Sequence, residues 1–313
     1  MLPLLFLLLA TPGPICDAIW HDEARNRDVP VRVRMPAGTG KVPLVVYSHG
    51  MGGDINGGGL WGAAWAKRGI AVIHVQHLGS DIAIYRDAPT PADVPARVRG
   101  AATPEQLLAR VGDVRFVLNE VARRPREAAC DLTRVDPDRI GFAGHSMGAW
   151  TAQALAGERW PSGGPGGVTL ADRRIRAAIA LSPSAPFVTD PAEAFGKIGM
   201  PFLSITGSED GAPATAPAEL RAAAEVQRTT PFRAMPAGNK MLLVFAGGDH
   251  MVFSGNAKRA ERPADAHIKA VTIAATTAFW GSNMLLSKRD MVFLASPKGL
   301  QAELLPGDTL DTK

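Results

Sequence analysis

A serine lies between two glycines at a spacing that suits nucleophilic chemistry, in the stretch GHSMG at residues 144–148. Gly-x-Ser-x-Gly is typical of a nucleophile elbow, a sharp turn between a strand and a helix that exposes the serine hydroxyl. Glycine at both flanking positions removes side chains that would collide with the adjoining strand and helix, and it tolerates unusual dihedrals. An apolar run over 139–144 predicts a buried strand before the motif, and a helix is expected from Met147. This context favours an elbow that presents Ser146 over a Gly-rich turn that contains a serine by chance.

A histidine and a carboxylate later in the chain could activate that hydroxyl. Serine is a poor nucleophile until a base removes its proton, and His250 in AGGDHMVF follows the last core strand that the sequence predicts. The base needs a carboxylate that holds its tautomer and stabilises the imidazolium. Asp210 in TGSEDG is our first candidate, Glu209 is the neighbouring alternative and Asp190 is a more distant one. We therefore predict the set Ser146, Asp210 and His250, in that order along the chain.

Two backbone amides are candidates for binding the negative oxygen of a tetrahedral intermediate, which needs at least two donors already in place. The amide of Met147 directly follows the serine. The stretch SHGMGG at 48–53 is expected to supply the other donor, from Met51, because its glycines let the backbone come close to a substrate.

The other histidines show no pattern that requires a metal ion or a cofactor. His145, beside the serine, is expected to point away from the exposed hydroxyl and to brace the elbow. His74 and His77 are three residues apart at a strand end, but no carboxylate or cysteine accompanies them at a ligand spacing. The strand predicted at 43–48 lacks the glycine pattern of dinucleotide sites. We therefore expect neither a metal nor a cofactor.

Apolar runs and helical periodicities alternate along most of the chain. Continuous apolar runs predict buried strands at 42–48, 70–77, 139–144, 176–182, 201–206 and 241–246. Helical spacing predicts helices near 57–68, 104–124, 147–158, 217–228 and 264–280. Strands that alternate with helices form a doubly wound, mainly parallel sheet through right-handed crossovers, which is an α/β fold. Active groups gather at the carboxyl ends of such strands, where the motifs above lie.

Three further segments frame this predicted sheet. Residues 29–35 alternate apolar and charged residues, as expected of a half-buried edge strand. Residues 79–104 are rich in Pro, Asp and Arg and predict a long surface excursion, and 157–172 predicts a Gly/Pro-rich loop. Too few residues separate 176–182 from 201–206 for a lid, so we predict a single domain without a large cap.

Composition limits the classes of partner. The 313 residues carry a net charge of +4 and the densest basic run, Arg123 to Arg126, is brief and has no interleaved aromatics. A nucleic-acid surface is therefore not favoured, and no run is long enough to span a membrane.

The first residues resemble an export signal. An apolar run followed by Pro, Gly and small residues predicts a signal peptide over 1–18, removed after Ala18; a buried N-terminal segment is the alternative. The protein would then be secreted or periplasmic. The two cysteines, Cys16 and Cys130, offer no disulfide framework, and cleavage would leave Cys130 alone. The predicted domain is 19–283, followed by a C-terminal extension, 284–313, of unknown role.

Together these motifs carry a resemblance to a known family. GHSMG, HGMGG at 49–53, HLGSD at 77–81 and GGDHMVFSG at 247–255 resemble the α/β-hydrolase superfamily over about residues 29–281. Within it they look like the branch that joins dienelactone-hydrolase-like proteins with bacterial relatives of platelet-activating-factor acetylhydrolases and polyester-cleaving esterases. The resemblance implies Ser146 as nucleophile, Asp210 as acid, His250 as base, and the amides of Met51 and Met147 as oxyanion donors. True dienelactone hydrolases have Cys where this chain has Ser146, so their activity is not expected.

The sequence thus predicts a serine carboxylester hydrolase that forms an acyl-enzyme and acts on small or extended esters, acetyl and polyester-like esters included. An acyltransferase or a peptidase could use the same residues, and a binding protein could retain the fold without turnover. The expected partner is a small-molecule ester. Large apolar side chains near the motifs are candidate pocket walls, with core packing as the alternative for each: Trp61, Trp65, Trp150, Met251 and Phe253.

Overall fold

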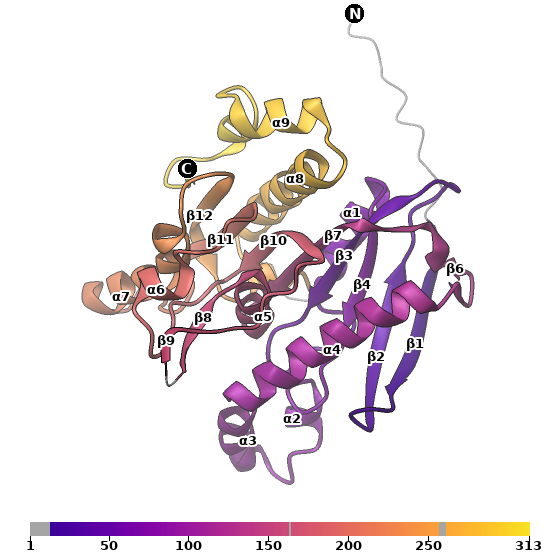
Figure 1. The fold of residues 1–313 in the computed structure, drawn as a ribbon. Helices are drawn as coiled ribbons and strands as arrows, with labels where there is room; N and C mark the ends of the chain where they lie inside the picture. Colours follow the sequence, from indigo (N-terminus) through magenta and orange to yellow (C-terminus); the bar gives the residue numbers. More distant parts are fainter. Residues whose placement is uncertain (1–12, 163, 257–260) are drawn as a thin grey trace, which may run out of the picture.

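A nine-stranded sheet runs through the described part of the computed structural model, which covers residues 13–162, 164–256 and 261–313 (Figure 1). The strand order is β1-β2-β4-β3-β7-β10-β11-β12-β13, and β4, β3, β7, β10, β11 and β12 pair in parallel. The strands are β1 (Ile15–Asp22), β2 (Arg27–Arg34), β3 (Val42–Ser48), β4 (Ala71–Val75), β7 (Val135–His145), β10 (Ile175–Leu181), β11 (Phe202–Glu209), β12 (Lys240–Asp249) and β13 (Thr309–Thr312). This is the mainly parallel, doubly wound sheet that the sequence predicts.

Helices cover both faces of the sheet because the strand residues alternate between two apolar layers (Figure 1). In β3, Leu44 and Val46 join the core cluster on the side of α4 and α5, whereas Val45 and Tyr47 join the cluster on the side of α1 and α8. The helices are α1 (Gly59–Lys67), α2 (Ala83–Arg86), α3 (Val94–Ala101), α4 (Pro104–Arg123), α5 (Met147–Ala156), α6 (Pro191–Phe195), α7 (Ala218–Ala234), α8 (Asp265–Met284) and α9 (Lys288–Ala295). Among the described residues, none of these helices combines the length and apolar character that a membrane crossing needs.

Three local predictions differ from the structure. The segment at 29–35 is not at the edge, because β1 pairs with the outer side of β2. The excursion at 79–104 contains α2 and α3, which bury few side chains and therefore leave little apolar periodicity. The stretch at 157–172 contains a hairpin of β8 (Arg159–Ser162) and β9 (Gly164–Thr169) rather than an irregular loop.

The C-terminal segment completes the domain instead of extending it. β13 pairs antiparallel with β12, and α9 packs against α8. Leu310 and Leu304 lie against the core cluster beneath α8. An open sheet edge exposes unpaired backbone groups, so the role of 284–313, which the sequence left open, includes covering the β12 edge.

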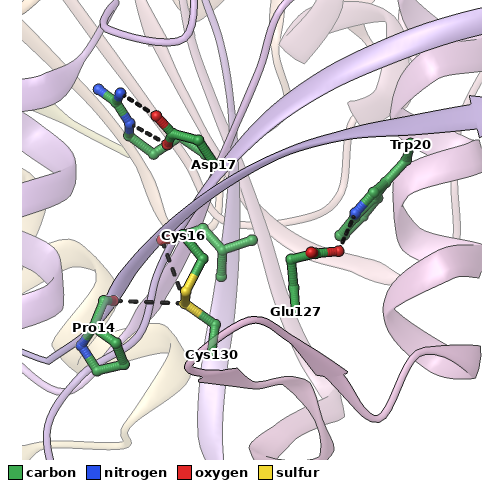
Figure 2. The surroundings of a disulfide bond; sticks show 8 residues. Pro14, Cys16, Asp17, Trp20, Glu127 and Cys130 are labelled. Carbon is green, nitrogen blue, oxygen red and sulfur yellow. Dashed lines mark hydrogen bonds and ion pairs between the residues drawn. A yellow bond between two sulfur atoms is a disulfide. The ribbon is translucent and has the colours of Figure 1, made fainter.

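The N-terminal prediction on cysteine pairing is wrong. Cys16 of β1 and Cys130 form a disulfide with a Cα–Cα distance of 6.2 Å, across a sequence separation of 114 residues (Figure 2). The indole of Trp20 also donates to Glu127 at 2.8 Å, so β1 is held twice to the short hairpin of β5 (Arg126–Glu127) and β6 (Cys130–Asp131). Cleavage after Ala18 would cut β1 and remove half of the disulfide. Sequence distance hid this pairing, because only the sheet brings the two segments together.

The carboxyl group of Glu158, just after α5, is buried without a hydrogen-bond partner among the described residues. Burial raises its pKa to about 8, whereas the unfolded chain has a value near 4.5. Between these values the folded protein holds one proton more than the unfolded chain, so its stability falls as pH rises. We expect Glu158→Gln to match the wild type at pH 4 and to be more stable at pH 7 by about 3 kcal/mol.

Urea unfolding of both proteins from pH 4 to pH 8 measures this difference. Glu193→Gln, on the exposed start of α6, is the control and should keep the slope of the wild type. Parallel pH profiles for Glu158→Gln and the wild type would contradict the buried, proton-holding state.

Candidate active site

Ser146 occupies a strained turn between β7 and α5. Its φ is +55° and its ψ is −115°, a backbone conformation that residues other than glycine rarely adopt. A Cβ at Gly144 would lie 2.2 Å from the carbonyl oxygen of Gly148, and a Cβ at Gly148 would lie 2.0 Å from that of Ser48. Both flanking glycines are therefore required by backbone contacts, as the motif predicts.

The structure brings the three predicted side chains into one hydrogen-bonded row. Ser146 Oγ lies 2.9 Å from His250 Nε2, and His250 Nδ1 lies 2.7 Å from Asp210 Oδ1. They follow the ends of β7, β11 and β12, and β10 lies between β7 and β11 in the sheet. With the proton on Nδ1 bonded to the carboxylate, Nε2 is free to accept the proton of the serine.

Asp210 is held by more than the imidazole. Its Oδ2 accepts a hydrogen bond from Thr206 at 2.8 Å, and Arg228 Nε lies 3.0 Å from its Oδ1. Burial tends to raise the pKa of Asp210, but the hydrogen bond from His250 and the charge of Arg228 outweigh it and keep that pKa below its ordinary value. The group is thus an ionised, fixed acceptor at neutral pH.

The alternative acid, Glu209, faces a different partner. Arg262 lies 2.5 Å from Glu209 Oε2 and 2.9 Å from Asp249 Oδ2, so one guanidinium holds the two carboxylates that adjoin Asp210 and His250 in sequence. Asp190 caps the start of α6. Of the three acidic candidates, only Asp210 touches the imidazole of His250.

His145 braces the base, not only the elbow. Its Nε2 lies 2.8 Å from the carbonyl oxygen of His250, and the two rings are 4.7 Å apart. Burial lowers the pKa of His145 to about 3, so its ring is neutral and donates one hydrogen bond that holds the backbone of His250.

The loop after β3, residues 48–53, lies directly against the serine. We call it the β3 loop. A Cβ at Gly50 would lie 3.3 Å from Cβ of Ser146, so glycine permits this close approach. In the described part of the chain, the amides of Met51 and Met147 donate to no protein acceptor. Met51 lines the cavity that contains Ser146, and Met147 directly follows the serine, so both amides are candidate donors to a ligand.

A cavity of about 430 Å³ opens over this row. Its walls include the β3 loop, Tyr85 of α2, Met251 and Ser254. Tyr85 and Met251 expose 44% and 50% of their surface, so they offer apolar contact area to a substrate. Most of the side chains that line the cavity are uncharged.

Most of the predicted wall residues are core residues instead. Trp61, Trp65 and Phe253 are fully buried in the cluster beneath α1 and α8. Trp150 packs partly on the opposite core and edge-on against the exposed ring of Phe187. Of the five residues predicted, Met251 alone lines the cavity. Aromatic content near a motif does not reveal which side of a helix faces the sheet.

Sequence reasoning missed Arg228 and Tyr85. Arg228 lies on α7, and nothing in its neighbourhood marks it, because the helix is polar on most sides. Tyr85 lies in the excursion whose helices the periodicity does not reveal. The described residues also contain no group of three or more potential metal ligands, and His74 and His77 bond to Gly57 and to Asp113 respectively.

No family model and no curated protein matches this chain. Solved structures do resemble it. One is a ferulic acid esterase from Streptomyces cinnamoneus, with a TM-score of 0.60 and 20% sequence identity over 89% of this chain and 92% of that one. The mainly parallel sheet, its strand order and this likeness show that the chain has an α/β-hydrolase-type fold.

Proposed function

We propose that the protein is a serine carboxylester hydrolase that works through an acyl-enzyme. The observation that carries the proposal is the 2.9 Å contact between Ser146 Oγ and the free nitrogen of His250, on a strained elbow that opens into a cavity. A protein of similar fold is a ferulic acid esterase, which supports the reaction class.

In this mechanism His250 Nε2 takes the proton of Ser146 as Oγ attacks the carbonyl carbon of the ester. The carbonyl oxygen becomes an anion that the amides of Met51 and Met147 bind. The imidazolium, stabilised by Asp210, gives its proton to the departing alcohol, which leaves an acyl group on Oγ. A water molecule, deprotonated by the same nitrogen, then attacks that acyl group. The bond from the acyl carbon to Oγ breaks, the carboxylic acid departs, and the imidazolium returns the proton to the serine.

The substrates that fit this cavity are small or extended esters. Tyr85 and Met251 supply apolar surface, and the described residues include no large cap over them. Short acyl esters, aromatic acyl esters of the hydroxycinnamate kind and polyester-like chains are therefore the classes to test. The branch of platelet-activating-factor acetylhydrolase and polyester-cleaving relatives remains part of this proposal.

A fluorophosphonate probe tests the nucleophile directly. We expect one adduct per chain, on the peptide that contains Ser146. We also expect steady-state hydrolysis of p-nitrophenyl esters at a rate that depends on the length of the acyl chain. Ser146→Ala, folded as judged by circular dichroism, is the control and should show neither. Labelling of another residue, or no labelling of the folded wild type, would overturn the proposal.

Product analysis separates the competing activities. Transfer of the acyl group to an added alcohol in preference to water would indicate an acyltransferase, and cleavage of the matching anilide would indicate a peptidase. A binding protein that lacks turnover would leave the probe unreacted.

Export remains part of the proposal. A disulfide persists in oxidising compartments and is rare in reducing ones, and Cys16 and Cys130 form one. We propose a secreted or periplasmic protein whose leader, if removed, ends before β1. N-terminal sequencing of the mature protein from its native host tests the position.

A further inference from the structure

We propose that Arg110 is a positioning residue of the oxyanion hole, which acts by holding both ends of the β3 loop. The inference rests on the proposed function, because it concerns the donor that this loop offers to an ester. Arg110 lies in the middle of α4 and is not among the residues that line the cavity.

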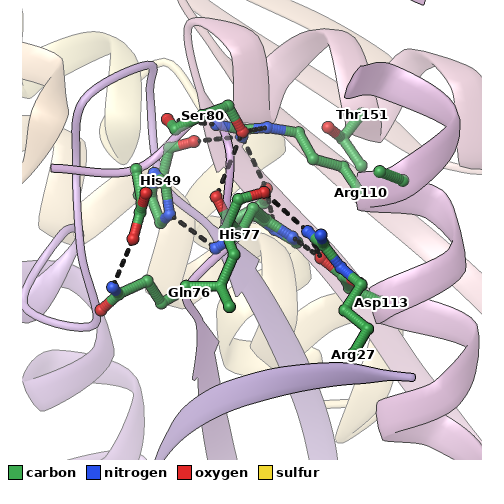
Figure 3. A network of polar contacts seen from close by, with 12 residues as sticks. Arg27, His49, Gln76, His77, Ser80, Arg110, Asp113 and Thr151 are labelled. Atoms are coloured by element: carbon green, nitrogen blue, oxygen red, sulfur yellow. Dashed lines mark hydrogen bonds and ion pairs between the residues drawn. The ribbon is translucent and has the colours of Figure 1, made fainter. Parts of the chain in front are cut away.

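The hydrogen bonds of Arg110 to the described residues go to this loop and to Ser80. Its Nη1 donates to the carbonyl oxygen of His49 at 2.6 Å and to Ser48 Oγ at 3.3 Å. Its Nε donates to Ser80 Oγ at 3.0 Å, and its Nη2 to the carbonyl oxygen of Ser80 at 3.4 Å. One planar guanidinium therefore joins the start of the loop to residue 80 (Figure 3).

Residue 80 in turn holds the other end of the loop. The carbonyl oxygen of Ser80 also accepts the amide of Gly52 at 2.9 Å. Gly52 has a φ of +73°, and the glycines on either side of Met51 supply no side chain of their own to fix the backbone. The contacts at Ser48, His49 and Gly52 that help to direct the Met51 amide all lead to Arg110. The loop is also held by bonds independent of Arg110, from Gly53 to the carbonyl oxygen of Gly50 at 3.1 Å and from Ile82 to that of Gly53 at 2.9 Å.

The hydrogen bonds behind the loop form a chain with a fixed direction. Burial lowers the pKa of His77 to about 4, so its ring is neutral. Its Nδ1 lies 2.9 Å from Asp113 Oδ2 and donates to it, which leaves Nε2, 2.8 Å from Ser48 Oγ, as an acceptor. Ser48 gives its hydrogen to His77 and its lone pair to Arg110. Because the proton positions are determined, the Ser48 hydroxyl has one orientation, in which its oxygen accepts from Arg110.

This row of Ser48, His77 and Asp113 resembles a second nucleophile set, but its surroundings exclude that role. All three side chains are buried, and Ser48 Oγ faces Arg110 instead of the cavity. Its hydroxyl is a structural donor.

Burying the charged guanidinium of Arg110 has a desolvation cost that packing alone does not offset. It is fully buried, and its nitrogen atoms contact only uncharged oxygens, because the carboxylate of Asp113 is taken by His77 and Arg27. Burying a cation without a direct counter-ion costs stability. A fully buried guanidinium that touches the β3 loop is therefore best explained by what it does to that loop.

The position of Arg110 in the sequence of α4 is itself unusual. Arg110 is three residues after Leu107 and four before Val114, which both lie on the buried face of α4. A charged residue on the apolar stripe of a helix is unusual and indicates a specific partner inside the protein.

The test compares an ester with its thionoester, in which sulfur replaces the carbonyl oxygen. Sulfur is larger and accepts hydrogen bonds weakly, so a donor in the oxyanion hole accelerates the ester much more than the thionoester. We expect Arg110→Gln to lower kcat for the ester by about 10²-fold and the ratio of ester to thionoester rates by at least about tenfold, with KM nearly unchanged. Arg110→Lys keeps the charge but not the fork, and should fall between.

Arg115→Gln is the matched control. Arg115 lies on the same helix, is 42% exposed and donates to the carbonyl oxygen of Leu170. It should keep the rate ratio of the wild type. Ser80→Ala removes one acceptor of Arg110 and should also lower the ratio, by several-fold, in a variant that retains the buried charge.

The outcomes are distinguishable. Equal losses for ester and thionoester in Arg110→Gln would overturn the proposal, since a general loss of folding affects both. If Arg110→Gln does not fold, an unchanged ratio in Ser80→Ala and Arg110→Lys overturns it, and a lowered ratio in both supports it. A wild type that hydrolyses neither substrate fails the proposed function itself, and the inference with it.

Discussion

Asp210→Asn is expected to lower kcat for ester hydrolysis by about 10⁴-fold, with a small change in KM. The carboxylate lies 2.7 Å from His250 Nδ1 and 3.0 Å from Arg228 Nε. An amide cannot neutralise the imidazolium that forms during acyl transfer, and it leaves the Arg228 cation without its counter-ion. Binding of the ester to the cavity does not use Asp210, so the loss falls on the chemical step.

Glu209→Gln is the control for this variant, because it changes the adjacent carboxylate. Glu209 bonds to Arg262 at the surface and does not touch His250. Its removal should leave kcat close to the wild-type value. The measurement is steady-state hydrolysis of an aryl ester, with thermal unfolding to show that both variants fold. A large loss in Glu209→Gln together with a small loss in Asp210→Asn would reverse the assignment.

The double variant Cys16→Ala/Cys130→Ala is expected to lose about 4–5 kcal/mol of unfolding free energy. The disulfide closes a loop across a sequence separation of 114 residues, and a cross-link over a long loop removes much of the entropy of the unfolded chain. It also fixes β1, whose partner β2 leads into the parallel part of the sheet.

Guanidinium unfolding with and without a reducing agent measures this effect. The reductant should lower the midpoint of the wild type and leave the double variant unchanged. Thiol titration of the denatured, unreduced wild type should find no free cysteine. Two free thiols, or a wild-type midpoint that does not respond to reductant, would contradict the cross-link.

Local patterns in the chain were enough to predict the elbow, to point to His250 and to narrow the acid to a few candidates. The glycines around Ser146 are required by backbone contacts with Ser48 and Gly148, and such short-range sterics leave a direct mark on the sequence. Buried parallel strands also leave one, because both of their faces need apolar residues. The predicted set of Ser146, Asp210 and His250 follows from this, since the carboxyl ends of such strands meet at one edge.

Only the tertiary structure shows which side chains face each other across the fold. The choice of Asp210 over Glu209 depends on which of two neighbours turns toward His250, and a loop has no periodicity that states it. The core positions of Trp61, Trp65 and Phe253, and the disulfide of Cys16 with Cys130, depend on segments that lie far apart in the sequence. Arg110 shows the same limit: its place on an apolar stripe marks it as unusual, but its partners, Ser48 and Ser80, come from other elements. Steric limits in a turn and the apolar pattern of a buried strand involve residues that are close in sequence. Contacts across the sheet join residues that are far apart in sequence, so they exist only in the packed domain.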